Sequence, residues 1–401
     1  MRDSAEVVVV GLGVIGASIV FHLTERGAGR VIALDRGPAG EGMTRRSTGL
    51  VRTHYLNEPE ARMALASLPY WHGWQERVGG DSTFVPSGAL VVARPEDADT
   101  VRRSVEMLRS LGVNTRLLAP EEIADIQPHM AVEDLGPAAY EPDSGYCDVP
   151  AEAARSLAAA AIRLGADVRE GVEAIGLATE NGRVTGVRTP AGDIHAGAVV
   201  IAAGVWSDLV GRAIGVDIPI WRRRGQSAVL ERPRALARGY RVTLDRVLGI
   251  STRPYGGDQA LTTLTGGFDR PVEDPDDYDQ SLDPSIATIL QRSLPGRYPP
   301  FSQSKVVHGW AGLYDMSPDT RAILDRVPDP EGLYVACGFS GTGFKKAPAV
   351  GACMAELIVE GRSSTVDIHP FRWSRFEEDD PLEDHWGYSI PSLQKRQEAL
   401  L

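Results

Sequence analysis

The feature that most constrains the fold lies near the start of the chain, where residues 7–16 read VVVVGLGVIG and Asp35 ends the next apolar run, VIALD. Four consecutive valines are typical of a strand that is buried on both faces in a parallel sheet. Gly11, Gly13 and Gly16 follow at G-x-G-x-x-G spacing, and a helical pattern continues after them. In this pattern the first glycine makes a tight turn, the second admits a pyrophosphate, and the third lets helix and strand pack closely.

The same segment predicts a dinucleotide site. Free N–H groups and the dipole at a helix N-terminus favour a pyrophosphate, and Asp35 is placed to accept a hydrogen bond from a ribose hydroxyl. The alternative is a glycine turn with only a structural role. The dinucleotide site is favoured because the strand, the helix, the second strand and the acid at its end all occur in the expected order. The motif alone leaves open whether the dinucleotide is NAD or FAD.

Size and charge limit the other possibilities. A chain of 401 residues suits two domains, and a net charge of −12 argues against nucleic acid or an anionic membrane as a partner. The apolar stretch near the start is short and broken by glycines, so we do not expect it to span a membrane. Three scattered cysteines form no pair with metal-ligand spacing, which predicts a cytoplasmic protein without a metal site.

Four segments of the chain carry a resemblance to a known family. They are VVVVGLGVIG with Asp35, RRSTGLVR at 45–52, VVIAAGVWSD at 199–208, and GLYDMSPD with GFSGTGFKKAPAVG between 312 and 351. Together they resemble the FAD-dependent amine oxidoreductases of the D-amino-acid oxidase superfamily, and the sarcosine oxidase branch is the nearest likeness. The resemblance extends to about residue 370, and GFSGTGFK is its most specific motif.

The resemblance implies an α/β fold (α+β overall), with a Rossmann-like FAD-binding domain of the glutathione-reductase type and a second domain built on an antiparallel sheet. Alternating strand patterns between residues 218 and 267 independently favour the antiparallel sheet. We expect a docked or loose C-terminal tail rather than a catalytic element, because the last segment is acidic and then mixed in charge. The expected parts are 1–52, 140–217 and 305–370 for FAD binding, 53–139 and 218–304 for the substrate or cap domain, and 371–401 for the tail.

A second glycine-rich turn favours FAD over NAD. Gly338, Gly341 and Gly343 precede the final helical stretch, and such a turn offers N–H donors and positive potential to the anionic edge of a flavin ring. The alternative is a turn that only caps a helix. The cofactor-binding residues that the motifs and the resemblance imply are Gly11, Gly13, Val14, Ile15, Gly16, Asp35, Arg36, Arg46, Ser47, Thr48, Gly49, Leu50, Val172, Ala203, Gly204, Trp206, Gly312, Gly338, Ser340, Gly341, Thr342, Gly343 and Lys345.

Two cations are the leading candidates for substrate binding. Enzymes of this family pass a hydride from the carbon beside an amine to flavin N5, and the imine then hydrolyses, so the protein mainly orients the substrate. The resemblance matches Arg52 and Lys345 to a pair that grips the substrate carboxylate, in which Arg supplies a fork and Lys a point charge. Alternatively, Arg52 forms an ordinary ion pair, and Lys345 is solvent-exposed beside Lys346.

Three further side chains are weaker catalytic candidates. Tyr314 matches an aromatic position of the pocket, and Tyr255 is a less certain one; either residue could equally be core packing. His54 follows Arg52 closely and could face the flavin, although a lone histidine has many other uses.

Two departures from the family pattern affect the chemistry. Relatives that attach FAD covalently use a cysteine where this chain has Gly312 or a histidine where it has Arg46, so we predict non-covalent FAD. Oxidases of the branch also place a lysine over the flavin to promote reaction with oxygen, whereas no lysine occurs between residues 1 and 304. Arg253 could substitute. The electron acceptor is therefore either O2 or another molecule.

The predicted function is oxidation of a small amine or amino acid by an FAD-dependent enzyme. A 2-hydroxy-acid dehydrogenase is the alternative within the same fold, because the cationic pair would hold that carboxylate as well. A non-catalytic FAD-binding assembly protein is the alternative from another class. Substrate identity, stereochemistry and oligomeric state stay open.

Overall fold

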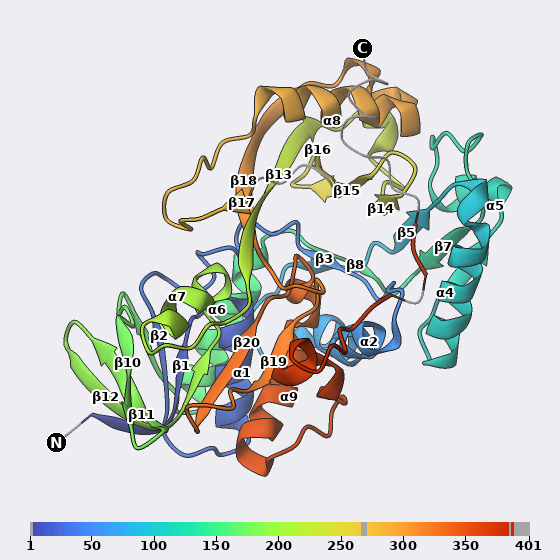
Figure 1. Cartoon of the computed structure of the whole chain (residues 1–401). Coiled ribbons are helices and arrows are strands. Elements are labelled where there is room, and N and C mark those ends of the chain that lie inside the picture. Colours follow the sequence, from blue (N-terminus) through green and yellow to red (C-terminus); the bar gives the residue numbers. More distant parts are fainter. Residues whose placement is uncertain (1–2, 266–270, 385, 389–401) are drawn as a thin grey trace.

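The computed structural model describes residues 3–265, 271–384 and 386–388. Figure 1 shows two lobes, with the long strands β13 and β18 rising from the lower lobe into the upper one. The valine-rich segment forms β1 (Ser4–Val10), which pairs in parallel with β2 (Val31–Asp35) and β12 (Gly192–Ile201). Val8 and Val9 have no exposed surface. Both faces of β1 are therefore covered, as four consecutive valines predict.

The lower lobe is built on an eight-stranded sheet. The main path runs in the order β10-β11-β12-β1-β2-β9, and β20 joins it by pairing with both β12 and β19. The pairs that involve β1, and the β2–β9 and β12–β20 pairs, are parallel. The remaining strands of this sheet are β9 (Asp167–Glu170), β10 (Gly176–Glu180), β11 (Arg183–Thr189), β19 (Ile323–Arg326) and β20 (Leu333–Cys337).

Helices cover one face of this sheet. α1 (Val14–Glu25) packs against α6 (Pro150–Arg163) and α9 (Gly343–Glu360), and α9 packs in turn against α2 (Glu58–His72). α1 and α9 can approach closely because of Gly351, where a Cβ would lie 2.2 Å from the Ser18 hydroxyl oxygen. The other helices of the described chain are α3 (Trp74–Arg77), α4 (Ala98–Ser110), α5 (Pro120–Ile126), α7 (Ser207–Arg212) and α8 (Pro284–Arg297).

The upper lobe is built on a nine-stranded, mainly antiparallel sheet, of which only the β14–β5 pair is parallel among the described strands. α8 packs on β13, β16 and β18 of this sheet. A three-stranded sheet of β3 (Leu50–Val51), β4 (Phe84–Val85) and β8 (Gly145–Cys147) completes the fold. The strands of the large sheet are β5 (Ala89–Val92), β6 (Arg116–Leu118), β7 (Ala138–Glu141), β13 (Trp221–Glu231), β14 (Val242–Asp245), β15 (Ile250–Tyr255), β16 (Gln259–Leu264), β17 (Pro271–Val272) and β18 (Val306–Met316).

The segment after α9 leaves the lower lobe and crosses towards α4, as the red trace in Figure 1 shows. The Leu382 amide donates to Asp319 at 3.0 Å, the Asn57 side chain donates to Asp384 at 2.7 Å, and the Thr100 hydroxyl donates to the Gly387 carbonyl at 3.1 Å. The described part of this segment is therefore docked against both lobes. No helix within the described ranges is long and apolar enough to cross a membrane.

Candidate cofactor and substrate site

A cavity of about 780 Å³ extends from the start of α1 to strands β13 and β18. Its size suits an extended dinucleotide, which is larger than most ligands of protein pockets. The predicted cofactor residues that line it are Gly11, Gly13, Val14, Ile15, Asp35, Arg36, Arg46, Ser47, Thr48, Ala203, Gly204, Trp206, Gly312, Gly341 and Gly343.

Other predicted cofactor residues lie outside the lining, and some of them pack closely against the segments that form it. A Cβ on Gly16 would lie 1.9 Å from the Gly11 carbonyl oxygen, and a Cβ on Gly49 would lie 2.3 Å from the Cys147 carbonyl oxygen. The Val172 amide donates to the Asp35 carbonyl at 2.9 Å, which places its neighbours Glu173, Ala174 and Ile175 on the wall instead. Leu50, Gly338, Ser340, Thr342 and Lys345 also lie outside the lining.

At the nucleotide end, backbone amides and one carboxylate organise the cavity. Asp35 accepts hydrogen bonds from the Leu12 amide at 2.7 Å and from the Gly37 amide at 2.9 Å. Burial raises the pKa of Asp35, while these two amides lower it. The Thr44 hydroxyl oxygen accepts from the Val14 amide at 3.0 Å, at the first turn of α1. Asp35 keeps acceptor capacity for a ribose hydroxyl, and α1 presents its N-terminus to a phosphate.

An ion pair joins the two lobes beside this end of the cavity. The Arg36 guanidinium pairs with Asp276, a residue of the loop before α8, and lies 4.7 Å from the centre of the Trp206 ring. The Trp206 ring nitrogen donates to the same Asp276 carboxylate at 3.0 Å. All three side chains line the cavity. A ligand in the cavity would therefore be held by both lobes at once.

At the other end, glycines leave room for Tyr314. A Cβ on Gly225 would lie 2.5 Å from the Tyr314 ring, and a Cβ on Gly341 would lie 3.1 Å from it. Tyr314 lines the cavity between them, beside Asp315. Burial raises the pKa of Asp315 to about 6, although the Phe339 amide donates to it at 3.2 Å.

Two adjacent lysines begin α9, and they have different surroundings. Lys346 donates to Glu60 at 2.6 Å and to the Thr342 hydroxyl at 2.7 Å, and both members of the ion pair are almost fully buried. Lys345 is also buried, yet its ammonium group has no hydrogen bond or ion pair with any described residue. A helix N-terminus disfavours cations. The first turn of α9 therefore holds one paired lysine and one buried lysine without an ion-pair partner among the described residues.

Arg52 adds to this positive charge. It follows β3 and is half-buried, donates to the His54 carbonyl, and lies 4.6 Å from the centre of the Tyr55 ring. No carboxylate of the described chain pairs with it. Burial, together with the charge of Arg52, lowers the pKa of Lys345 well below its usual value. The structure thus places the two predicted substrate-binding cations within electrostatic reach of each other.

The remaining catalytic candidates have other surroundings. The His54 ring nitrogen Nε2 lies 2.7 Å from the Tyr388 hydroxyl, and burial lowers the pKa of His54 well below its usual value, so the ring is neutral. Tyr255 packs in an aromatic cluster with His308 and Trp310. Neither His54 nor Tyr255 lines the large cavity.

Sequence reasoning missed several residues of the site. Glu60 decides which lysine is paired. The Trp71 ring nitrogen donates to the Lys345 carbonyl at 2.9 Å and so fixes the start of α9. The Arg246 guanidinium lies 5.2 Å from the centre of the Tyr388 ring. No local pattern links these residues to the motifs, because each reaches the site only through the tertiary fold.

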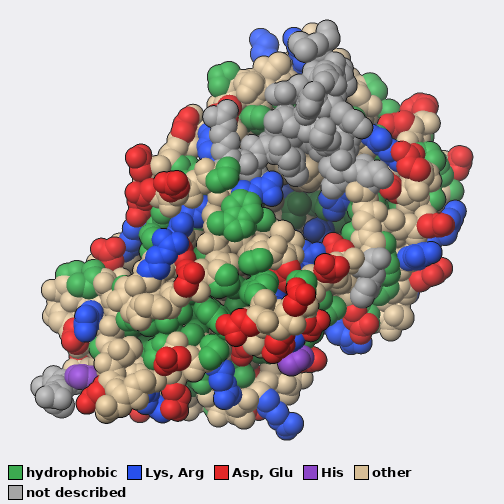
Figure 2. Space-filling view, viewed as in Figure 1, with side chains coloured by type: hydrophobic (Ala, Val, Ile, Leu, Met, Phe, Trp, Pro, Cys, Tyr) green, Lys and Arg blue, Asp and Glu red, His purple; other side chains and the backbone are tan. Residues whose placement is uncertain are grey.

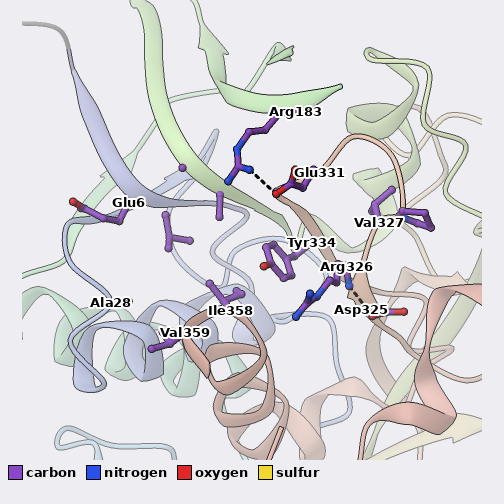
Figure 3. Close-up of a pocket in the computed structure, with 15 residues that line it drawn as sticks. Glu6, Ala28, Arg183, Asp325, Arg326, Val327, Glu331, Tyr334, Ile358 and Val359 are labelled. Atoms are coloured by element: carbon purple, nitrogen blue, oxygen red, sulfur yellow. Dashed lines mark hydrogen bonds and ion pairs between the residues drawn. The ribbon is translucent and has the colours of Figure 1, made fainter. Parts of the chain in front are cut away.

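Basic side chains also occur at the surface between the two lobes. Figure 2 shows a hollow between the two lobes with blue Lys or Arg side chains along its walls. A second cavity, of about 660 Å³, lies at the edge of the lower sheet (Figure 3), but there Arg183 pairs with Glu331, and Arg326 donates to the Gly361 carbonyl. The arginines of the second cavity are therefore already paired or hydrogen-bonded within the protein. Within the described ranges, no group of three or more His, Cys, Asp or Glu residues could hold a metal ion.

Comparisons with known proteins agree with the site. The sequence model of the family described as "DAO: FAD dependent oxidoreductase" matches residues 6–357. The chain is 28% identical over 381 residues to sarcosine oxidase subunit beta of Rhodobacter capsulatus, covering 92% of this chain and 89% of that protein. It is 28% identical over 387 residues to glycine oxidase of Geobacillus kaustophilus, covering 94% and 98%. The crystal structure of L-proline dehydrogenase from P. horikoshii superposes with a TM-score of 0.87 at 27% identity, covering 95% and 100%. The predicted resemblance and fold class are confirmed.

Proposed function

Because the chain belongs to the DAO family of FAD-dependent oxidoreductases, we propose that it oxidises a small amine or amino acid that carries a carboxylate. The observation that carries the proposal is that two cations, Arg52 and Lys345, have no ion-pair partner among the described residues. An arginine without a carboxylate partner is costly inside a protein, and a substrate carboxylate would supply the missing charge. The printed names of the similar proteins, which include a sarcosine oxidase subunit, a glycine oxidase and a proline dehydrogenase, support the same class of substrate.

The residues of the large cavity fit FAD. The start of α1 would hold the pyrophosphate, Asp35 the ribose, and the turn at Gly341 and Gly343 the flavin end. When bound, FAD accepts the hydride from the carbon beside the substrate nitrogen, and water then converts the imine to a carbonyl compound and an amine. The prediction that FAD is held without a covalent bond agrees with Gly312, where a Cβ would already lie 3.1 Å from the Arg46 side chain.

The protein contributes orientation and charge. Arg52 would grip the carboxylate with its planar fork, and Lys345 would add a point charge from the start of α9. Tyr314, wedged between Gly225 and Gly341, would limit the space on the flavin side. Holding the carboxylate fixes where the neighbouring C–H bond points, which is the main catalytic requirement for hydride transfer.

The acceptor is expected to be a molecule other than oxygen. The Arg253 guanidinium is the candidate substitute for the missing lysine, but it pairs with Asp148 at 3.1 Å and donates to the Thr48 carbonyl at 2.6 Å. Its charge is therefore largely compensated and is a weak source of stabilisation for superoxide. Flavin that is reoxidised over minutes in air-saturated buffer fits a dehydrogenase, whereas reoxidation within seconds shows an oxidase.

The function is tested by mixing the holoprotein with candidate substrates without oxygen and following the flavin absorbance. Bleaching by a carboxylate-bearing amine supports the proposal. Bleaching only by a 2-hydroxy acid supports the alternative dehydrogenase, and no bleaching by either class contradicts an enzymatic role of this kind. Acid precipitation separately tests the attachment of FAD, since flavin that stays with the pellet is covalently bound.

A further inference from the structure

A third cation lies beside the proposed carboxylate clamp. Arg246 follows β14 and is held in place by a hydrogen bond from its backbone amide to the Val92 carbonyl at 2.9 Å. Its guanidinium lies over the Tyr388 ring, and the Tyr388 hydroxyl contacts His54, whose carbonyl accepts a hydrogen bond from Arg52. Arg246 and Arg52 are therefore connected through only two intervening residues, Tyr388 and His54.

The fully buried arginines of the described chain differ from the half-buried Arg246. Each of the four arginines that are buried in the described chain pairs with at least one carboxylate, in the pairs Arg222–Asp208, Arg253–Asp148, Arg297–Asp245 and Arg375–Asp319. Arg246 has no such partner in the described chain, and its Nε atom is shielded from solvent without a hydrogen bond.

The nearby carboxylates are already used elsewhere. Asp245 and Asp384 are the acids whose charge acts on Arg246, but Asp245 pairs with Arg297 at 2.6 Å and Asp384 pairs with Arg321 at 2.6 Å. Burial and the repulsion of Arg52 lower the pKa of Arg246 to about 10. The chain thus holds a half-buried guanidinium against electrostatic cost, which a bound anion would offset.

We infer that Arg246 is a second anion-binding residue of the substrate site and that the substrate carries two carboxylates. This inference rests on the proposed function. Arg52 and Lys345 hold the carboxylate beside the reacting carbon, while Arg246 holds the distal one, with Tyr388 of the C-terminal segment as the wall behind it. One carboxylate alone would leave part of the charge of Arg52, Lys345 and Arg246 uncompensated. An amino acid with an acidic side chain, or an amine with two carboxylate arms, would compensate more of this positive charge than a single carboxylate does.

The test uses unreactive anions, so that it does not depend on turnover. Dissociation constants of the FAD-loaded protein are measured from flavin difference spectra for propanedioate, butanedioate and pentanedioate, each against the monocarboxylate with the same number of carbons. For the best-fitting length we expect the dicarboxylate to bind about 10- to 100-fold more tightly, the range given by one additional hydrogen-bonded charge.

Three variants make the test specific. Arg246→Met should reduce the ratio of the two constants to about one, Arg246→Lys should keep part of the preference because it keeps the charge, and Arg103→Met should keep all of it because Arg103 is exposed on α4. Equal affinity for both anions in the wild type, or a preference that survives in Arg246→Met, overturns the inference. Amines that bleach the flavin would still support the proposed function in that case, whereas failure of all amines would contradict the function itself.

Discussion

The nucleotide end and the substrate end of the site hold charge in opposite ways. At the nucleotide end charges are matched within the protein, because Asp35 accepts from two amides and Arg36 pairs with Asp276. At the substrate end Arg52 and Lys345 have no carboxylate in the described chain. The two helices differ in the same way, since the first turn of α1 carries no acidic or basic side chain, whereas that of α9 carries two lysines.

This difference separates two tasks. A dinucleotide is held by backbone amides and by the absence of side chains, which any member of such a family can share. A substrate is selected by uncompensated side-chain charge, which a few substitutions can change. Substitutions at the nucleotide end should therefore act on cofactor content, and substitutions of the unpaired cations at the substrate end should act on catalysis with little effect on folding.

The largest effect is expected for Gly16→Ala. The new Cβ would lie 1.9 Å from the Gly11 carbonyl oxygen, so α1 must move away from β1 and the phosphate-binding turn is lost. We expect a cost of about 3 kcal/mol or more and a purified protein with almost no flavin, as measured by the ratio of absorbance at the flavin and protein bands. Gly257→Ala is the control, because a Cβ at that position would have no atom within 4 Å. Normal flavin content in Gly16→Ala would contradict the described packing.

After this loss of the cofactor, the largest effect on stability alone is expected for Glu60→Gln. Lys346 would keep a buried charge without its partner, which typically costs about 3–5 kcal/mol. The free energy of unfolding from urea titration measures the loss, and Glu58→Gln on the same helix is the control because its pair with Arg62 is exposed. Equal stability of the two variants would show that Lys346 is not the paired lysine.

Arg52→Met should come third and should act on catalysis alone. Loss of the guanidinium removes the fork that holds the substrate carboxylate, so kcat/KM for a carboxylate-bearing amine should fall about 30- to 1,000-fold. The free energy of unfolding should stay the same or rise, because repulsion with Lys345 is removed. An unchanged KM would exclude Arg52 from substrate binding.

Lys345→Met should have a smaller effect that depends on pH. Burial and Arg52 lower the pKa of Lys345 well below the usual value for lysine, so its charge is lost at a lower pH than in an ordinary lysine, and KM for a carboxylate substrate should rise on the alkaline side. The effect on stability is separate. Between the folded-state and unfolded-state pKa values of Lys345, the folded protein holds fewer protons than the unfolded protein, so this group makes the free energy of unfolding rise with pH. Lys345→Met should weaken both trends, in pH profiles of KM and of urea unfolding. Profiles identical to the wild type would contradict this role.

The smallest effect is expected for Arg36→Met. Its pair with Asp276 is about half exposed on both sides, and exposed pairs contribute about 0.2–1 kcal/mol. The dissociation constant of FAD, measured by fluorescence titration of apoprotein, should rise about two- to fivefold. Asp276→Asn should have a similar effect, and the double variant should be no weaker than either single variant. Fully additive losses would show that the two residues act separately.

The sequence predicted the frame of the site better than its electrostatics. The strand–turn–helix around Gly11, and Asp35 at the end of β2, depend on local periodicity and spacing, and the family match confirms the FAD-dependent class. Which of Lys345 and Lys346 is paired depends on Glu60, a residue of another helix. Adjacent positions in a sequence carry no information about such a partner. The domain limits and the roles of the individual site residues stay predictions.

The C-terminal segment was the least predictable part. Its acidic composition suggested a tail, and only the fold places Asp384 beside Arg321 and Tyr388 beside His54 and Arg246. The predicted catalytic candidates Tyr255 and His54 show the reverse case. Both are aromatic residues near important motifs, yet Tyr255 packs with other aromatic side chains and His54 supports Arg52 through its carbonyl.

The position of β1 has a consequence for biosynthesis. β1 leaves the ribosome well before β12, with which it pairs, and before α9, against which the following helix packs. The first βαβ unit therefore lacks one of its main neighbours until α9 (Gly343–Glu360) has been translated. At roughly 5–20 residues per second, this wait is on the order of tens of seconds. FAD would therefore join the fold only after α9 has been made, and flavin loading becomes a late checkpoint for the assembly of the lower lobe.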